Sequence, residues 1–414
     1  MRARLKFSAL ILGLLALLAT GFSTRAECCP FCPSPTLTLS EQFAQADAVA
    51  LVQWVSGEKS KEGTAGSTTF EILQIARDPS KTLEKGTKIT LAGYRIGKPG
   101  DLSLLMGSRG AKVEWGPPIE VTEMVFNYIL QAPTTEVPAA KRLSYFMKFL
   151  EYPDPTISAD AFGEFANAPY GDIVLVADKL PRDKLRAWVM QKDLPDSRLG
   201  LYGLLLGLCH NPDDAALMEQ KIAELPETQR IRIGIDGVMA GYLLLNGEKG
   251  IDYLEKTKIS DKSVPFSETY AAMMALRFMW TYGEGQIPPA RLQSAMRSLL
   301  PRPELSDIVI ADLARWKDWS LMPKLMQMYD KKEYDIPSIK RAIIRYMIAA
   351  QKDLPKVAAS KTPPTVAEAG SSSTAAKAAE PPAKPQHAVD GAKHLEELRE
   401  KDPKMVEMVE RFPG

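Results

Sequence analysis

Three of the four cysteines lie within five residues of one another, and they have the clearest chemical potential in the chain. They are Cys28, Cys29 and Cys32. Two thiols separated by two residues, such as Cys29 and Cys32, can form a disulfide, exchange disulfides with a substrate or contribute to a metal site. Catalytic exchange requires the first thiol to lie at a helix N-terminus, where its pKa falls. The context of the cluster therefore decides its chemistry.

That context favours a structural disulfide. No strand can precede the cluster, because the predicted leader ends at Ala26, and Pro33 impedes a helix that would start directly after it. The Cys-Pro-Phe-Cys spelling resembles the active site of the glutaredoxins, which implies redox chemistry as one alternative. We expect a disulfide instead, either Cys29 to Cys32 or Cys28 to Cys32. Metal or cofactor attachment is a further alternative, although no histidine follows Cys32, which disfavours covalent haem.

Five charged residues interrupt helices that are otherwise apolar: Asp236, Arg277, Asp312, Arg315 and Arg345. Two carboxylates in apolar surroundings are suited to acid–base catalysis, which would pair Asp236 with Asp312. However, an arginine directly precedes an aromatic residue in three successive helices, and a catalytic site is built once and does not repeat. We therefore interpret the five residues as a polar ladder of contacts between repeats, and we predict no catalytic residue.

The elements that position these charges form a repeating helical array, predicted over residues 136–353. An aromatic residue recurs on apolar helices every 30 to 40 residues: Tyr202, Tyr242, Phe278, Trp316 and Tyr346. A loose period of this length is typical of stacked helix pairs, an α-solenoid. The pattern resembles HEAT-type repeats. The chain also resembles exported planctomycete-type proteins that combine a Cys-Pro-Phe-Cys start with such helices, a resemblance that implies no activity.

Residues 27–135 are predicted to form a cysteine-led β domain. Short strands are expected near residues 48–55, 68–76, 88–91 and 102–106, and glycine-containing turns between them favour a small barrel. The cysteines, the following prolines, residues 43–52 and residues 69–72 resemble the start of the netrin-like module, an OB-type barrel shared with tissue inhibitors of metalloproteinases (TIMPs). The resemblance implies inhibition of a metalloprotease as an alternative function. Those inhibitors begin with a cysteine, whereas Glu27 precedes Cys28 here.

The composition is that of a globular protein, with 45% apolar and 25% charged residues. The net charge is +1; without residues 1–26, which hold four basic residues, 48 basic residues face 51 acidic ones, a net charge of −3. This near-balance argues against a nucleic-acid-binding surface. Three histidines are too few for histidine-cluster chemistry, and no P-loop, nucleophile-elbow, zinc-protease or calcium-loop spelling is present.

Residues 1–26 read as a secretory signal peptide. A basic start precedes an apolar run over residues 10–19, and small residues flank the expected cleavage after Ala26. We therefore expect an exported protein, periplasmic, at the cell surface or secreted, and membrane-bound only if the leader stays uncleaved.

Residues 354–414 are predicted to form a disordered tail rich in alanine and proline. A short charged helix is expected over residues 394–412, split at Pro403, and we expect this end to be solvated and unattached.

Together these features predict an α+β multidomain chain: a small OB-like β-barrel, a HEAT-like α-solenoid and a disordered tail. We expect a non-catalytic binding or scaffold protein that contacts an unknown protein partner through the helical array, with no cofactor, metal or nucleic acid. The alternatives are a redox or metal-handling protein that uses the cysteine cluster, and a metalloprotease-inhibitor-like module.

Overall fold

The computed structural model describes residues 29–32, 36–61, 65–110, 112–224, 231–355 and 384–412. The predicted leader, Cys28 and residues 356–383 of the predicted disordered tail lie outside these ranges. The chain divides into two compact units, Met1–Cys209 and His210–Gly414, each described by itself below. The domain boundaries predicted at residues 135 and 353 stay predictions. Across the described ranges, no helix has both the length and the apolar character that a membrane span requires.

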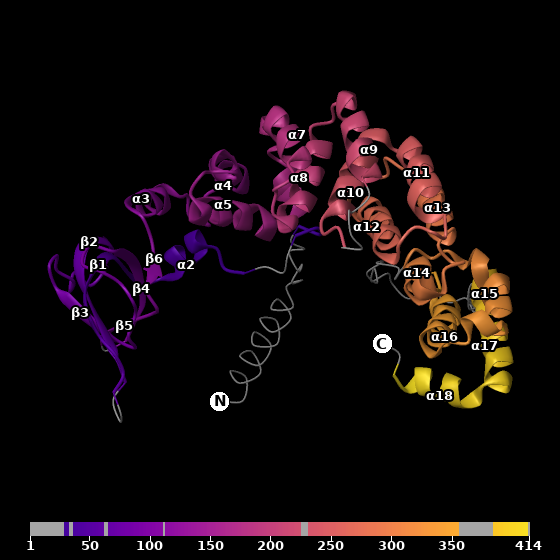
Figure 1. Ribbon diagram of the computed structural model, residues 1–414. Helices are drawn as coiled ribbons and strands as arrows, with labels where there is room; N and C mark the ends of the chain where they lie inside the picture. Colours follow the sequence, from indigo (N-terminus) through magenta and orange to yellow (C-terminus); the bar gives the residue numbers. More distant parts are fainter. Residues whose placement is uncertain are drawn as a thin grey trace, which may run out of the picture. The chain divides into compact units, whose positions relative to one another are not determined.

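The first unit begins with a small antiparallel β-barrel that is nearly closed, as predicted (Figure 1). The strand order is β3-β2-β1-β4-β5, and β6 pairs with β4. The strands are β1 (Ala48–Glu58), β2 (Ser67–Arg77), β3 (Lys88–Ala92), β4 (Leu102–Arg109), β5 (Val113–Trp115) and β6 (Ile119–Glu120). The pairing of β1 with β2 shifts register three times, and such irregularities bend long strands far enough to curl a sheet.

Alternate residues of the central strands form the barrel core. Ala50 and Val52 of β1 pack with Phe70 and Ile72 of β2 and with Leu105 of β4. The side chains between them on β1 are buried as well, so both faces of this strand are covered. This explains why the sequence of β1 is a continuous apolar run without alternation.

Short helices follow the barrel in the first unit. The α-helices are α2 (Leu39–Gln45), which precedes the sheet, then α3 (Glu123–Gln131), α4 (Ala139–Phe146), α5 (Pro155–Asn167), α6 (Tyr170–Val174), α7 (Arg182–Met190) and α8 (Asp196–Leu208). A proline directly precedes α4, α6, α7 and α8. Because proline cannot continue the preceding helix, these residues set the spacing of the array.

In the second unit, α10, α12, α14 and α16 lie along one side and α9, α11, α13 and α15 along the other (Figure 1). The helices are α9 (Ala215–Ala223), α10 (Ile235–Asn246), α11 (Glu248–Leu254), α12 (Phe266–Tyr282), α13 (Pro289–Arg297), α14 (Pro303–Arg315), α15 (Met322–Tyr329) and α16 (Pro337–Lys352). Helix α10 packs on α12, and α14 packs on α16. The predicted helical array is therefore present.

All five recurring aromatic side chains are buried, as helix packing requires. Trp316 stacks on Trp280 with 4.3 Å between ring centroids, and Tyr346 packs edge-on against Trp319 at 5.2 Å. The hydroxyl of Tyr202 donates to the carbonyl oxygen of Leu150, so its polar end is satisfied. These rings are therefore part of the packed core between the helices.

The prediction of a solvated, unattached C-terminal end is wrong. The end forms two helices, α17 (Gln386–Lys401) and α18 (Pro403–Arg411), and both pack on α16. Their apolar faces are buried, including Leu395, Leu398, Val406 and Val409. Many charged residues separate the apolar residues of α17, so the sequence pattern did not indicate an apolar face on this helix.

A close approach of α17 to α16 depends on Gly391. An added Cβ at this position would lie 3.0 Å from both the backbone nitrogen of Gln351 and the carbonyl oxygen of Met347. These are backbone atoms of α16, so they cannot swing aside as a flexible side chain could. Glycine is therefore the residue that lets the two helices touch.

We predict that Gly391→Ala weakens the docking of α17 by about 1–3 kcal/mol, the usual cost of overpacking a close contact. Amide hydrogen exchange should become faster in α17 while exchange in α10 stays unchanged. The matched control is Gly171→Ala, because an added Cβ there meets no atom within 4 Å. Unchanged exchange of α17 in the Gly391 variant would contradict the assignment.

Candidate functional site

The cysteine cluster forms a disulfide between Cys29 and Cys32, with 5.5 Å between the two Cα atoms. The prediction of a disulfide is thereby confirmed, while Cys28 lies outside the described residues. Cys29 is only 5% exposed, and its backbone N–H donates to the carbonyl oxygen of Ala166 at 3.2 Å. The neighbouring Phe31 is buried too. The disulfide therefore fixes a short segment against α5, and the sulfur of Cys29 is shielded from large reactants.

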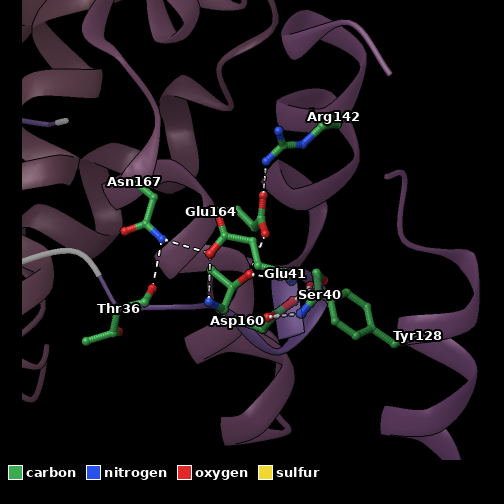
Figure 2. A network of polar contacts seen from close by, with 9 residues as sticks. Thr36, Ser40, Glu41, Tyr128, Arg142, Asp160, Glu164 and Asn167 are labelled. Carbon is green, nitrogen blue, oxygen red and sulfur yellow. Dashed lines mark hydrogen bonds and ion pairs between the residues drawn. The ribbon is translucent and has the colours of Figure 1, made fainter. Parts of the chain in front are cut away.

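Two buried carboxylates of α5, Asp160 and Glu164, hold the N-terminal end of α2 (Figure 2). Asp160 accepts from the backbone N–H of Ser40 at 2.9 Å and from its hydroxyl at 2.7 Å. It also accepts from the hydroxyl of Tyr128 at 2.8 Å. Backbone N–H groups in the first turn of a helix lack partners inside the helix, so Asp160 completes α2 from another part of the chain.

Glu164 is bound in the same network by a hydroxyl and a guanidinium. Thr38 donates to Glu164 at 2.6 Å, and Arg142 forms an ion pair with it. Burial raises the pKa of Glu164, although the bonds from Thr38 and Arg142 oppose that effect. Burial and the nearby Asp160 also raise the pKa of Tyr145 to about 12. Each carboxylate oxygen of Asp160 and Glu164 accepts from a donor on another element, so this network is a structural clamp between α2 and the helices that follow the barrel.

A second buried cluster, in the second unit, was missed by sequence reasoning. Glu268 at the start of α12 accepts from Arg232 and, at 2.7 Å, from Lys258. Burial alone would raise the pKa of Glu268, but Arg232 and Lys258 outweigh it and hold the pKa below its ordinary value. Arg232 also donates to the backbone carbonyls of Lys221 and Ile222 at the end of α9. The cluster therefore ties α9 to α12.

Lys258 reaches this cluster from a π-helical turn, Glu255–Ile259, that continues α11. The turn is stabilised by the hydroxyl of Thr269, which donates to the carbonyl oxygen of Lys258 at 2.8 Å. A π-turn accommodates one more residue than an α-helical turn, and it changes where the following side chains point. No spacing rule applied to the sequence would have placed this lysine in the interior.

The structure brings together three of the five predicted ladder residues. Arg277 of α12 donates to Asp312 of α14 at 2.5 Å, and Arg315 donates to the other oxygen of Asp312 at 2.8 Å. Asp312 is buried, and burial raises its pKa while Arg277 opposes that shift. The Arg277–Asp312 pair therefore joins successive helices of the array.

The other two ladder residues lie elsewhere. Asp236 is in the first turn of α10, where its carboxylate accepts from the N–H of Gly237 at 3.0 Å. Within the described ranges, no ion pair and no bond to Asp312 involves Asp236. Arg345 projects from α16 and donates to the carbonyl oxygen of Phe412 at 3.2 Å. The hypothetical catalytic pair is thus not assembled among the contacts that the structure contains.

A groove of about 560 Å³ runs between α14 and α16, and it is the candidate binding site. Its polar lining includes three arginines, Arg315, Arg341 and Arg345, and a single carboxylate, Asp307. The side chain of Arg315 is 71% exposed despite its contact with Asp312. The remaining lining residues are mostly small or apolar: Ile308, Ala311, Ala314, Ser338, Ala342, Tyr346 and Ala349. We call this the arginine groove.

A larger hollow of about 760 Å³ lies in the first unit, beside the barrel. It is lined by Trp54 and Tyr94 as well as by several polar residues. Two of its carboxylates bond to the local backbone: Asp101 accepts from the N–H of Lys98, and Asp154 accepts from the first N–H groups of α5. The charged residues of the hollow are one arginine, Arg95, and three carboxylates, Asp101, Glu120 and Asp154, so it lacks the excess of positive charge found in the arginine groove.

No family model, no curated protein and no solved structure matches this chain. The assignment of a site therefore depends on the geometry above.

Arg341 is the groove residue that sequence reasoning missed. A signal was available, because Arg341 and Arg345 are four residues apart and so lie on one face of a helix. The recurring Arg-aromatic pair includes Arg345, which precedes Tyr346, but not Arg341, which precedes an alanine. Within the described part of the chain, no hydrogen bond or ion pair involves the side chain of Arg341.

We predict that removing the Cys29–Cys32 disulfide lowers the stability of the chain modestly and abolishes no catalytic activity. The double variant Cys29→Ser/Cys32→Ser opens a four-residue loop. Because the loop is short, its closure entropy limits the loss in free energy of unfolding to about 2 kcal/mol. Denaturant unfolding of the two proteins would measure this difference. Reduced wild-type protein should match the double variant. A dithiol that rapidly reduces a disulfide substrate would contradict the structural assignment.

We predict that Asp236→Asn changes the free energy of unfolding by an amount that depends on pH. Burial raises the pKa of Asp236 above its ordinary value of 3.8, so the native chain is most favoured with this group protonated. Its contribution to stability is present below pH 3.8 and is lost as the pH rises through the raised pKa. Asparagine does not titrate and can still accept from Gly237. The difference in unfolding free energy should therefore shift in favour of Asp236→Asn as the pH rises above 3.8. A pH-independent difference would contradict the burial of this carboxylate.

Proposed function

We propose that this chain is an exported, non-catalytic binding or scaffold protein whose helical array holds a protein partner in the arginine groove. The observation that carries the proposal is the groove itself, where three guanidiniums face one carboxylate between two neighbouring helices. Arginine and buried apolar anchors supply much of the binding energy at protein interfaces. The groove offers both guanidiniums and an apolar floor.

The engagement of the buried acids supports a non-catalytic role. Acid–base catalysis needs a titratable group that a substrate can reach. Asp160, Glu164, Glu268 and Asp312 instead accept hydrogen bonds from other elements of their own unit. Among the described residues, no group of three or more metal-ligating side chains is assembled.

A protein partner accounts for the groove better than nucleic acid does. The chain has a net charge of +1, whereas nucleic-acid-binding domains carry a marked basic excess. The one aromatic residue of the groove, Tyr346, is fully buried, so it offers no surface on which a base could stack.

We also propose that the array is HEAT-like and that the barrel is netrin-like. The support is the two-sided arrangement of α9 to α16, and the order of a disulfide-led segment followed by an antiparallel barrel. Export is supported by the signal-like residues 1–26 and by the disulfide, since disulfides persist in oxidising compartments. The burial of Cys29 weighs against the redox alternative.

Site-specific photo-crosslinking tests the proposed function. A benzophenone amino acid replacing Ala314, which lines the groove, should yield a discrete adduct with another protein in the native envelope. The matched control replaces Lys324, an exposed residue of α15 that does not line the groove. An adduct from Ala314 and none from Lys324 is the expected result. The absence of any adduct at Ala314, or equal adducts at both positions, would contradict the proposal.

A further inference from the structure

The charges of the arginine groove are not balanced from within the chain. Asp312 accepts from both Arg277 and Arg315, so its charge is shared by two guanidiniums. Asp307 lines the groove, but one of its oxygens is occupied by the backbone N–H of Ile308 at 2.9 Å. Arg341 has no partner in the described ranges. The groove therefore carries an excess of positive charge that an anionic ligand would neutralise.

The spacing of two of these arginines suggests the shape of that ligand. Arg341 and Arg345 are one helical turn apart on α16, which separates them by about 6 Å along the helix axis. Two carboxylates four residues apart on a second helix have the same spacing. A helix that lies along α16 can therefore present one carboxylate to each guanidinium.

The floor of the groove permits a helix to approach closely. It is built from alanines of both helices: Ala311, Ala314, Ala342 and Ala349. Small side chains let two helix backbones come near each other, and apolar surface is buried when they do. Arg345 already binds one helix end at this face, because it donates to the carbonyl oxygen of Phe412, just after α18. Such carbonyls carry the negative end of the helix dipole.

We infer that the arginine groove binds an acidic helical segment of the partner protein, with two carboxylates four residues apart that contact Arg341 and Arg345. This inference rests on the proposed function and adds the chemistry of the partner. Arg315 faces the same ligand from the opposite wall of the groove. Each planar guanidinium can donate two parallel hydrogen bonds to one carboxylate.

Fluorescence anisotropy with the full chain and labelled alanine-based peptides tests the inference. The probe is a helical peptide with glutamates at positions i and i+4. The matched peptides carry glutamines at the same positions, or the same number of glutamates at i and i+2, which point to different faces. We expect the i, i+4 glutamate peptide to bind about tenfold more tightly than either, and its affinity to fall as salt is raised.

Protein variants identify the groove as the binding site. Arg341→Gln should weaken binding of the glutamate peptide by about tenfold, the usual effect of losing a charge-assisted hydrogen bond. Arg341 has no hydrogen bond or ion pair to lose within the described residues, so thermal unfolding should be unchanged and a folding defect is not confused with lost binding. The control Lys331→Gln/Lys332→Gln removes two exposed charges outside the groove and should bind as the native chain does.

Three outcomes would overturn the inference. These are equal binding of the glutamate and glutamine peptides, unchanged affinity in Arg341→Gln, and a single-stranded oligonucleotide that binds more tightly than the peptide at equal salt and depends on Arg341. If the Ala314 crosslink forms but the acidic peptide does not bind, the scaffold role stands and only the acidic-helix chemistry fails. If neither is observed, both proposals fail.

Discussion

The structure depends on the satisfaction of buried carboxylates by donors from neighbouring elements. A carboxylate removed from water costs several kcal/mol unless hydrogen bonds and positive charge replace its hydration. In this chain those replacements come from elsewhere in the fold: Ser40 and Tyr128 for Asp160, and Arg277 for Asp312. Each such acid binds two elements together, because removing either partner leaves the other buried and unsatisfied. Apolar burial supplies cohesion, and these acids specify which elements meet.

The same constraint separates the interior charges from those available for binding. Glu164 and Glu268 are enclosed, and arginines reach them from a neighbouring helix, α4, and from the segment before α10. On α16, in contrast, arginines project from a helix whose opposite face is buried by apolar residues such as Ile343 and Met347. A charged side chain that is not paired within the fold remains available to bind a ligand. The division between clamp and groove therefore follows from which side of a helix a charge occupies.

Much of the fold could be predicted from the sequence, because local sequence patterns indicate where its strands and helices lie. Alternation and turns located the strands of the barrel, prolines marked helix starts, and the recurring aromatics identified core positions. The disulfide followed from the spacing of Cys29 and Cys32. The site was harder, since contacts such as Arg232 with Glu268 join residues 36 positions apart and depend on how helices pack. The docking of α17 was not predicted for a similar reason. The need for glycine at position 391 arises from its contact with α16, which the sequence around it does not show.

The π-helical turn at Glu255–Ile259 has a consequence for tolerance to insertions and deletions. Each residue advances a helix by about 100° of rotation. Deleting a single residue there would restore ordinary helical winding and rotate Lys258 away from the interior, leaving Glu268 with one cation fewer. The length of this turn is consequently as constrained as the identity of its residues.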